Sequence, residues 1–236
     1  MTAATRLTIL ALAGVMMAAT GVGCHRGGAG GGMPPTSPAG RAVLLQPTDR
    51  HWSQPAPQHF RVVVETTKGT FVLAIDRALA PRGVDRFHQL VTAGYFDDSR
   101  FFRVVPGFIA QFGIPGDPAV TQVWKHRAID DDSVRTSNVR GTIAYAMNGP
   151  HTRTTQLFVS LADNSRLDAQ GFSPLGTVVE GMDVVDRLYG GYGENAGGGI
   201  RCGQQGRMMA EGNAHLDRDY PQLDRLIRAS VTPYVG

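Results

Sequence analysis

FFRVVPGFIAQ, residues 101–111, consists of two short apolar runs separated by Pro106-Gly107, a dipeptide that favours a turn. The two runs predict adjacent strands over residues 101–105 and 108–112. The strands and their turn would bring Arg103, Phe108 and Gln111 together. An arginine among aromatic side chains is unusual, although this stretch alone fits a surface arginine at the rim of a β core equally well.

On both sides of this stretch, short apolar runs and turn residues predict a strand-rich domain. Two runs that flank a Gly-containing turn predict a hairpin over residues 60–66 and 70–75. Further strands are expected over residues 141–147, 157–161 and 175–179, and helices over residues 81–93, 182–188 and 221–229. Residues 113–138 read as a long irregular segment. Several short strands with few helices predict a barrel or a sandwich, and a closed sheet is attractive because it leaves no edge strands.

Composition excludes several classes of protein. The chain has 236 residues, 42% hydrophobic and 18% charged, which fits one domain or two small ones. The net charge is only +3, and the basic residues, 21 of 23 of them Arg, are scattered, so we expect no nucleic-acid partner. Two Cys can build neither a disulfide framework nor a zinc site. Fibres, metal fingers and polytopic membrane proteins are thereby excluded.

The first residues have the pattern of an export signal. Arg6 precedes an uncharged, mostly apolar run over residues 7–19, shorter than the roughly 20 residues that a membrane-spanning helix needs. Gly21-Val22-Gly23-Cys24 then resembles the processing box of bacterial lipoproteins, in which the Cys receives the lipid. The sequence therefore predicts a signal peptide over residues 1–23 and a lipid on Cys24 that anchors the chain to a membrane surface. Simple cleavage that leaves Cys24 a free thiol is the alternative.

Glycine and proline mark the remaining boundaries. Residues 24–58 are rich in both and predict a disordered tether. The folded domain is expected over residues 59–189, followed by a C-terminal extension over residues 190–236 that carries the helix predicted near its end. That helix could pack on the domain or recruit a partner. Cys202 has no obvious partner if Cys24 is lipidated.

The usual catalytic motifs are missing from the sequence. It contains no phosphate-binding glycine loop before a Lys, no paired-His helix motif and no Gly-x-Ser-x-Gly elbow. The seven His have no ligand spacing. The acidic run at residues 130–132 could bind a cation, but a solvated loop is the favoured interpretation. We therefore expect neither a metal nor a cofactor.

Two segments together resemble a known family. FFRVVPGFIAQ and GPHTRTTQLF, residues 149–158, match in order and spacing the signatures of the cyclophilin peptidyl-prolyl cis-trans isomerases. Leu167-Asp168 and residues 176–185 resemble that family's closing strand and helix. The resemblance covers about residues 60–189. It implies an eight-stranded antiparallel barrel capped by two helices, which agrees with the strand-rich pattern.

The implied chemistry suits the residues present. Rotation of an X-Pro amide is slow because resonance must be broken, yet no bond is made, so neither a nucleophile nor a metal is needed. In the transition state the prolyl nitrogen gains a lone pair to which a guanidinium can donate a hydrogen bond. The resemblance assigns this role to Arg103. It implies a proline slot formed by Phe108, Ile109, Phe158, Leu167 and Phe172, with Gln111 holding the substrate backbone and Ala146 and Met147 lining the neighbouring edge.

The chain departs from the family pattern at several positions, including Phe112-Gly113 in place of Gly-Gly and Met147 in place of a polar residue. Arg166 stands where many members have Trp, which argues against tight binding of cyclosporin-class inhibitors. Phe172 stands where a His is common, in an alignment that requires a one-residue insertion. We expect a monomeric isomerase that acts on proline-containing polypeptides of the cell envelope. The alternatives are a Pro-peptide-binding module with little turnover and a structural envelope lipoprotein that functions through its tether.

Overall fold

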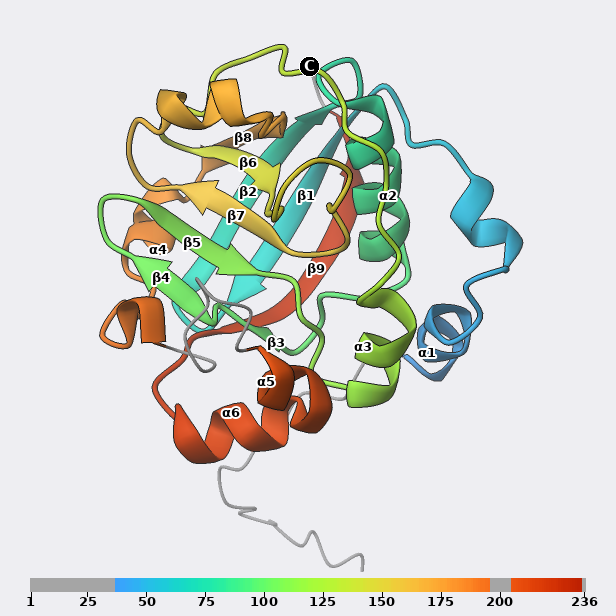
Figure 1. The fold of residues 1–236 in the computed structure, drawn as a ribbon, viewed down its shortest axis with the longest axis vertical. Coiled ribbons are helices and arrows are strands. Elements are labelled where there is room, and N and C mark those ends of the chain that lie inside the picture. Colours follow the sequence, from blue (N-terminus) through green and yellow to red (C-terminus); the bar gives the residue numbers. More distant parts are fainter. Residues whose placement is uncertain (1–36, 196–204, 235–236) are drawn as a thin grey trace, which may run out of the picture. The chain divides into compact units, whose positions relative to one another are not determined.

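The computed structural model describes residues 37–195 and 205–234, and its core is one antiparallel sheet (Figure 1). The nine strands are β1 (His59–Thr66), β2 (Gly69–Asp76), β3 (Ser99–Arg100), β4 (Arg103–Val105), β5 (Ile109–Phe112), β6 (Thr142–Tyr145), β7 (Leu157–Ser160), β8 (Pro174–Glu180) and β9 (Arg225–Pro233). Their order in the sheet is β3-β9-β1-β2-β8-β6-β7-β5-β4. The expected mainly-β architecture is confirmed.

The sheet curls around the core. Its two end strands, β3 and β4, are separated in sequence only by Phe101 and Phe102. Arg100 and Arg103 are therefore at most about 11 Å apart along the chain, although they belong to opposite ends of the strand order. The structure has nine strands where eight were expected, since residues 99–105 are divided at Phe101 and Phe102 into β3 and β4. β9, from the C-terminal extension, pairs between β3 and β1.

The predicted hairpin forms with the expected alternation. β1 and β2 pair from His59↔Asp76 to Thr66↔Gly69, and their buried residues alternate with more exposed ones. Val62 and Leu73 form one of these buried pairs and are completely inaccessible to solvent. Gly69 adopts φ +125°, a conformation that a side chain would disfavour, so it permits the tight turn.

Two of the predicted helices are confirmed, and a third lies in the segment expected to be irregular. α2 (Pro81–Thr92) lies along the sheet and buries Val84, Phe87 and Leu90, and α4 (Met182–Asp186) follows β8 (Figure 1). The unexpected helix is α3 (Pro118–Trp124). Asp117 caps it by accepting a hydrogen bond from the Ala119 N–H, and it buries Trp124 against the core.

The expected helix over residues 221–229 is wrong, because this segment enters β9. Residues of β9 pair with β1 from Phe60↔Pro233 to Thr66↔Leu226, with a bulge at Thr66. A strand there satisfies the backbone groups of β1 and β3 that would otherwise lie at an edge. The helices of the extension lie earlier, at α5 (Gly206–Glu211) and α6 (Asn213–Asp219).

The described part of the expected tether is folded. α1 (Pro38–Leu44) and the 3-10 helix η1 (Arg50–Ser53) precede β1. Leu44 is only 2% exposed, and the Trp124 Nε1–H donates to its carbonyl at 2.8 Å, so apolar burial overrides the Pro-rich composition. The predicted signal peptide, Cys24 and Cys202 lie outside the described residues. In residues 37–195 and 205–234, no helix has both the length and the apolar character required to cross a membrane.

Candidate functional site

The turn within FFRVVPGFIAQ places its polar residues side by side. β4 and β5 pair in antiparallel fashion, with Arg103 directly opposite Gln111. The turn is closed by the Phe108 N–H, which donates to the Val105 carbonyl at 2.9 Å, and Gly107 adopts φ +71°. Residues directly opposite on adjacent strands share one face of the sheet, so the two side chains meet there.

An apolar cluster lies beside this polar pair. Its buried members are Ile109, Ala144, Phe158 and Leu167, and its partly exposed members are Phe108, Ala146 and Phe172. The rings of Phe158 and Phe172 meet edge to face, with centroids 5.7 Å apart. The cluster has a buried floor and an accessible rim, the arrangement that an apolar ring needs in order to bind from solvent.

The structure thus gathers the residues that the sequence proposed for the site. Seven of them form the polar pair and most of the apolar cluster: Arg103, Gln111, Phe108, Ile109, Phe158, Leu167 and Phe172. Ala146 joins the rim, and the Met147 methyl group approaches the same region near Gly171. Ala144 is an additional member. The sequence does not distinguish it, because every residue of β6 is buried.

Arg103 is held on three sides. Its Nε and Nη2 donate to the two carboxylate oxygens of Glu194 at 2.9 and 2.8 Å, and its Nη1 donates to Gln111 Oε1 at 3.1 Å. The guanidinium carbon lies 5.5 Å from the centroid of the Phe108 ring. A guanidinium has five N–H donors, so these three bonds, the ones it makes within the described part of the chain, leave two for another acceptor.

A row of three glutamine side chains continues from Gln111. Gln111 Nε2 donates to Gln156 Oε1 at 2.9 Å, and Gln156 Nε2 donates to Gln205 Oε1 at 2.7 Å. We call Gln111, Gln156 and Gln205 the amide row. Glu194, in the 3-10 helix η3 (Gly193–Asn195), and Gln205 both come from the C-terminal extension. Neither residue is marked by a local sequence pattern, because each meets Arg103 or Gln156 only in the folded chain.

A partly exposed carboxylate, Asp168, supports the wall of the apolar cluster. Asp168 accepts hydrogen bonds from the Ser137 hydroxyl at 2.5 Å and from the backbone and side-chain amides of Asn138 at 2.9 and 2.7 Å. Burial alone would raise the pKa of Asp168, but these hydrogen bonds stabilise the anion and lower its pKa overall. Asn138 Nδ2 also donates to the Phe172 carbonyl at 2.8 Å, so Asp168 fixes the segment that carries Phe172.

Arg166 covers the outer side of Phe108. Its guanidinium carbon lies 4.7 Å from the ring centroid, and its Nη1 donates to Asn164 Oδ1 at 3.2 Å. Asn164 Nδ2 in turn donates to the Phe108 carbonyl at 2.8 Å. The residue that replaces the common Trp is therefore exposed at the rim of the apolar cluster, where it stacks through its flat guanidinium.

The acidic run at residues 130–132 is not simply a solvated loop. Asp132 is buried, and it accepts from the Arg82 and Gly83 N–H groups at the start of α2 and from Arg153 Nη1. It is a structural anchor for the helix. Within the described ranges, no group of three or more His, Cys, Asp or Glu side chains is arranged to hold a metal ion.

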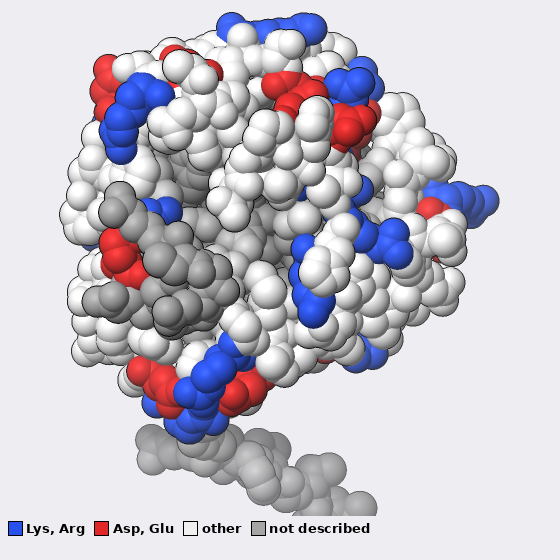
Figure 2. Space-filling view, in the orientation of Figure 1, with Lys and Arg blue, Asp and Glu red and all other residues white. Residues whose placement is uncertain are grey.

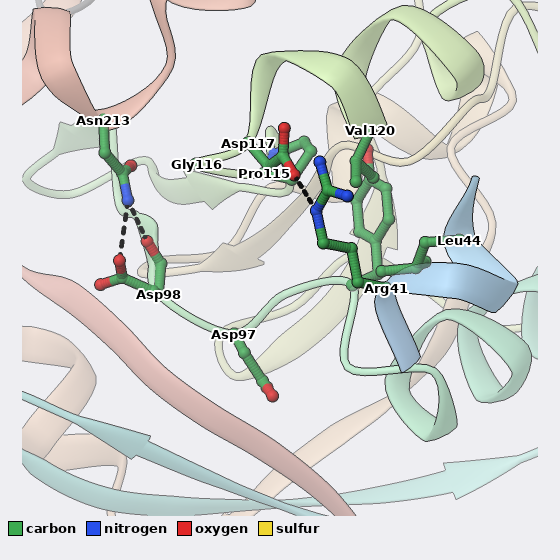
Figure 3. A pocket seen from close by; sticks show the side chains of 10 residues that line it. Arg41, Leu44, Asp97, Asp98, Pro115, Gly116, Asp117, Val120 and Asn213 are labelled. Atoms are coloured by element: carbon green, nitrogen blue, oxygen red, sulfur yellow. Dashed lines mark hydrogen bonds and ion pairs between the residues drawn. The ribbon is translucent and has the colours of Figure 1, made fainter. Parts of the chain in front are cut away.

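A cavity of about 270 Å³ lies where α1, the start of α3 and Asn213 approach one another (Figure 3). Its polar groups are largely paired: Arg41 with Asp117 at 2.7 Å, and Asn213 Nδ2 with Asp98 Oδ2 at 3.0 Å. Burial raises the pKa of Asp97, on the same wall, to about 6. This cavity shares no residue with the polar pair, the amide row or the apolar cluster.

Comparison with known proteins identifies the family. The model described as "Cyclophilin type peptidyl-prolyl cis-trans isomerase/CLD" matches residues 61–197. The chain belongs to this family of isomerases.

Curated relatives and solved structures agree with this family assignment. Peptidyl-prolyl cis-trans isomerase A of Dickeya dadantii is 35% identical over 145 residues, 58% of this chain and 74% of the relative. Peptidyl-prolyl cis-trans isomerase B of Escherichia coli is 30% identical over 180 residues, 72% of this chain and 98% of the relative. A cyclophilin-type isomerase of Cryptosporidium parvum has a TM-score of 0.54 at 18% identity, covering 75% of this chain and 99% of its own, and supports the fold.

Proposed function

We propose that this chain rotates X-Pro peptide bonds at the site formed by Arg103, Gln111 and the apolar cluster. The observation that carries the proposal is the position of Arg103 beside a partly exposed apolar cluster, with two donors that bond to no residue in the described ranges 37–195 and 205–234. Membership of the isomerase family supports the activity. A related cyclophilin was solved in the presence of the dipeptide Ala-Pro, which supports proline-containing polypeptides as substrates.

The geometry suits stabilisation of a twisted amide. The prolyl ring would bind against Phe158 and Phe172, while Gln111 holds the peptide backbone. As the amide twists, its nitrogen loses resonance and gains a lone pair, to which Arg103 donates a hydrogen bond that the planar ground state does not accept. A thousandfold acceleration requires about 4 kcal/mol of such differential binding. A pre-oriented charged donor beside apolar side chains is of the right strength to supply most of it.

The test is a protease-coupled isomerisation assay on a panel of X-Pro peptides. Arg103→Ala should reduce kcat/KM by about a hundredfold or more while peptide binding persists, because the lost bond forms only in the transition state. Arg207→Ala, which removes an exposed arginine of α5, is the matched control and should retain full activity. Unchanged turnover in Arg103→Ala would refute the assigned role. Peptide binding without turnover in the wild type would instead identify a Pro-peptide-binding module.

We also propose that the chain is exported, acts on envelope proteins as a monomer, and is anchored to a membrane surface by a lipid on Cys24. The support is the sequence of residues 1–24, a short apolar run followed by a lipoprotein-like box. On the face in Figure 2, basic and acidic side chains are interspersed rather than gathered into a basic stripe, which favours a polypeptide substrate over nucleic acid. Cys24→Ser should abolish palmitate labelling and release the protein from the membrane fraction. Labelling of the variant would contradict the anchor.

The closed eight-stranded barrel of the family is part of the proposal. Its support is the antiparallel pairing throughout the sheet and the short link between β3 and β4. Slow amide hydrogen exchange on the outward edges of both β3 and β4 would be expected of a closed sheet, and fast exchange there would indicate an open one.

A further inference from the structure

The C-terminal extension reaches the guanidinium on which the proposed isomerisation depends. Glu194 binds Arg103 through both carboxylate oxygens, and Gln205 binds Gln156 at the far end of the amide row. Arg103 is only 9% exposed, so this ion pair is partly withdrawn from water. Sites that must hold one side chain in one orientation use such bidentate pairs, because two parallel bonds fix the plane of the guanidinium as well as its place.

We propose that Glu194 is a positioning residue for Arg103, and that Gln205 positions Gln111 through Gln156. This inference rests on the proposed function and deepens it: the extension completes the catalytic site. Glu194 takes the Nε and Nη2 donors, and Gln111 takes one donor of Nη1. The two remaining donors both belong to the Nη atoms at the outer end of the guanidinium. The carboxylate therefore leaves an edge of the group available to the substrate while it fixes the direction in which that edge points.

A carboxylate on a catalytic cation also reduces its net charge, so the two effects must be weighed. The acceptor in this reaction is the lone pair of an amide nitrogen, which carries no full negative charge. The strength of the bond therefore depends more on distance and direction than on long-range Coulomb attraction. An arginine without a partner would also sample many rotamers and lose alignment. For this acceptor, orientation outweighs the lost charge.

The backbone around Glu194 is built to approach β4 closely. A Cβ atom on Gly190 would lie 3.1 Å from the Pro106 ring and 3.3 Å from the Val104 carbonyl oxygen, so glycine permits the contact between this segment and the strand of Arg103. Tyr192, two residues before Glu194, packs against a small second core. The Tyr192 ring also meets the Tyr189 and Tyr220 rings edge to face, at 5.1 and 5.2 Å.

That second core links the extension to the neighbour of Arg103. Its buried members are Phe102, Ile114, Met208, Leu216 and Leu223. Phe102 immediately precedes Arg103, and Met208 lies on α5, one turn after Gln205. Glu194 and Gln205 are thus presented by a packed unit, the arrangement that a positioning residue requires.

The test compares Glu194→Gln with Glu211→Gln in the full chain. Both replace a carboxylate of the extension by an amide of the same shape, but among the residues that the structure describes Glu211 pairs with the exposed Arg207 and Arg218 and not with Arg103. Glu194→Gln should lower kcat about tenfold and leave KM within twofold, because a misdirected donor weakens the transition state and not the bound peptide. Gln205→Ala should lower kcat less, and Glu211→Gln should behave as wild type. A structural role alone would raise KM or lower the Tm without this split.

Unchanged or increased kcat in Glu194→Gln would overturn the proposal, and an increase would mean that the carboxylate restrains the enzyme. A second readout is the ¹H–¹⁵N resonance of Arg103 Nε, identified by its loss in Arg103→Lys. It should exchange slowly in the wild type and in Glu211→Gln, and rapidly in Glu194→Gln. An Nε resonance unaffected by Glu194→Gln also overturns the proposal. If the wild type does not turn over X-Pro peptides, the proposed function fails, and the Nε resonance still decides whether Glu194 holds Arg103.

Discussion

The apolar and polar halves of the site have different origins in the chain. Every member of the apolar cluster lies within residues 108–172. The polar half, Arg103 and the amide row, begins in β4 and β5 but ends in the extension, which supplies Gln205 to the row and binds Arg103 through Glu194. We infer from this difference that the apolar cluster and Gln111 bind the peptide, while the extension supports the rate of rotation. Changes in the apolar half should alter peptide binding, and changes in the extension should alter rate.

Phe158→Ala should produce the largest effect, because it removes a ring that is 2% exposed from the floor of the apolar cluster. We expect a loss of about 4 kcal/mol in the free energy of unfolding and a peptide affinity too weak to measure. Urea unfolding and peptide titration provide the two measurements. Phe158→Leu, which retains most of the volume, should cost about 1 kcal/mol and keep binding. A folded Phe158→Ala variant that binds peptide normally would break the comparison.

Met208→Ala tests the extension in the same way. Met208 is fully buried in the second core, so the substitution should cost about 3 kcal/mol, and hydrogen exchange should accelerate in α5 and α6. We expect kcat to fall while KM stays within twofold, since the apolar cluster is untouched. If KM rises as much as kcat falls, the two halves are not separable.

Asp168→Asn sharpens the comparison within the apolar half. An amide at this position cannot accept from all three donors of Ser137 and Asn138, so we expect a loss of about 2 kcal/mol at pH 7 and a raised KM. The pKa of Asp168 in the fold lies below its unfolded value, so its stabilisation is present above about pH 4 and is lost as pH falls through the folded pKa. The difference in the free energy of unfolding between Asp168→Asn and the wild type should therefore become smaller as the pH falls. If this difference in unfolding free energy does not change with pH, the ionised Asp168 carboxylate is not the group that stabilises the fold.

Asp97→Asn should have the smallest effect. It is a control for both halves of the site, because Asp97 belongs to neither of them. Burial raises the pKa of Asp97 to about 6. The free energy of unfolding therefore decreases as the pH rises above about 4, and the whole loss is present above pH 6. Allowing for its partial exposure, we expect the amide to add about 1 kcal/mol at pH 8 and nothing below pH 4. Activity should not change. A destabilised variant at pH 8 would show that the charge is compensated.

Much of the fold was predictable because its signals are local. The β1–β2 hairpin follows from apolar alternation around Gly69, and α2 follows from Pro81 and the spacing of Val84, Phe87 and Leu90. The segment over residues 113–138, expected to be irregular, also contains a local helix pattern. Asp117-Pro118 is a helix start, and Val120 and Trp124 are four residues apart on one face.

The errors arose where distant residues decide the structure. Leu223, Leu226 and Ile227 have helical spacing, yet residue 226 pairs with Thr66, 160 positions earlier, and the ladder overrides the local pattern. For the same reason the sequence located Arg103, Gln111 and the apolar cluster, whose motifs are contiguous, but not Glu194 and Gln205. Their partners lie 91 and 49 residues away.

The position of β9 has a consequence for the order of folding. This last strand lies between β1, the first strand, and β3, so the sheet cannot be completed until residue 233 has left the ribosome. Until then the emerging chain presents one edge of β1 with its backbone groups unpaired, and closing so long a loop is slow. A chain cut before Arg225 would keep the contiguous motifs of the site but would lack the strand that joins the first part of the sheet to the segment just before Arg103.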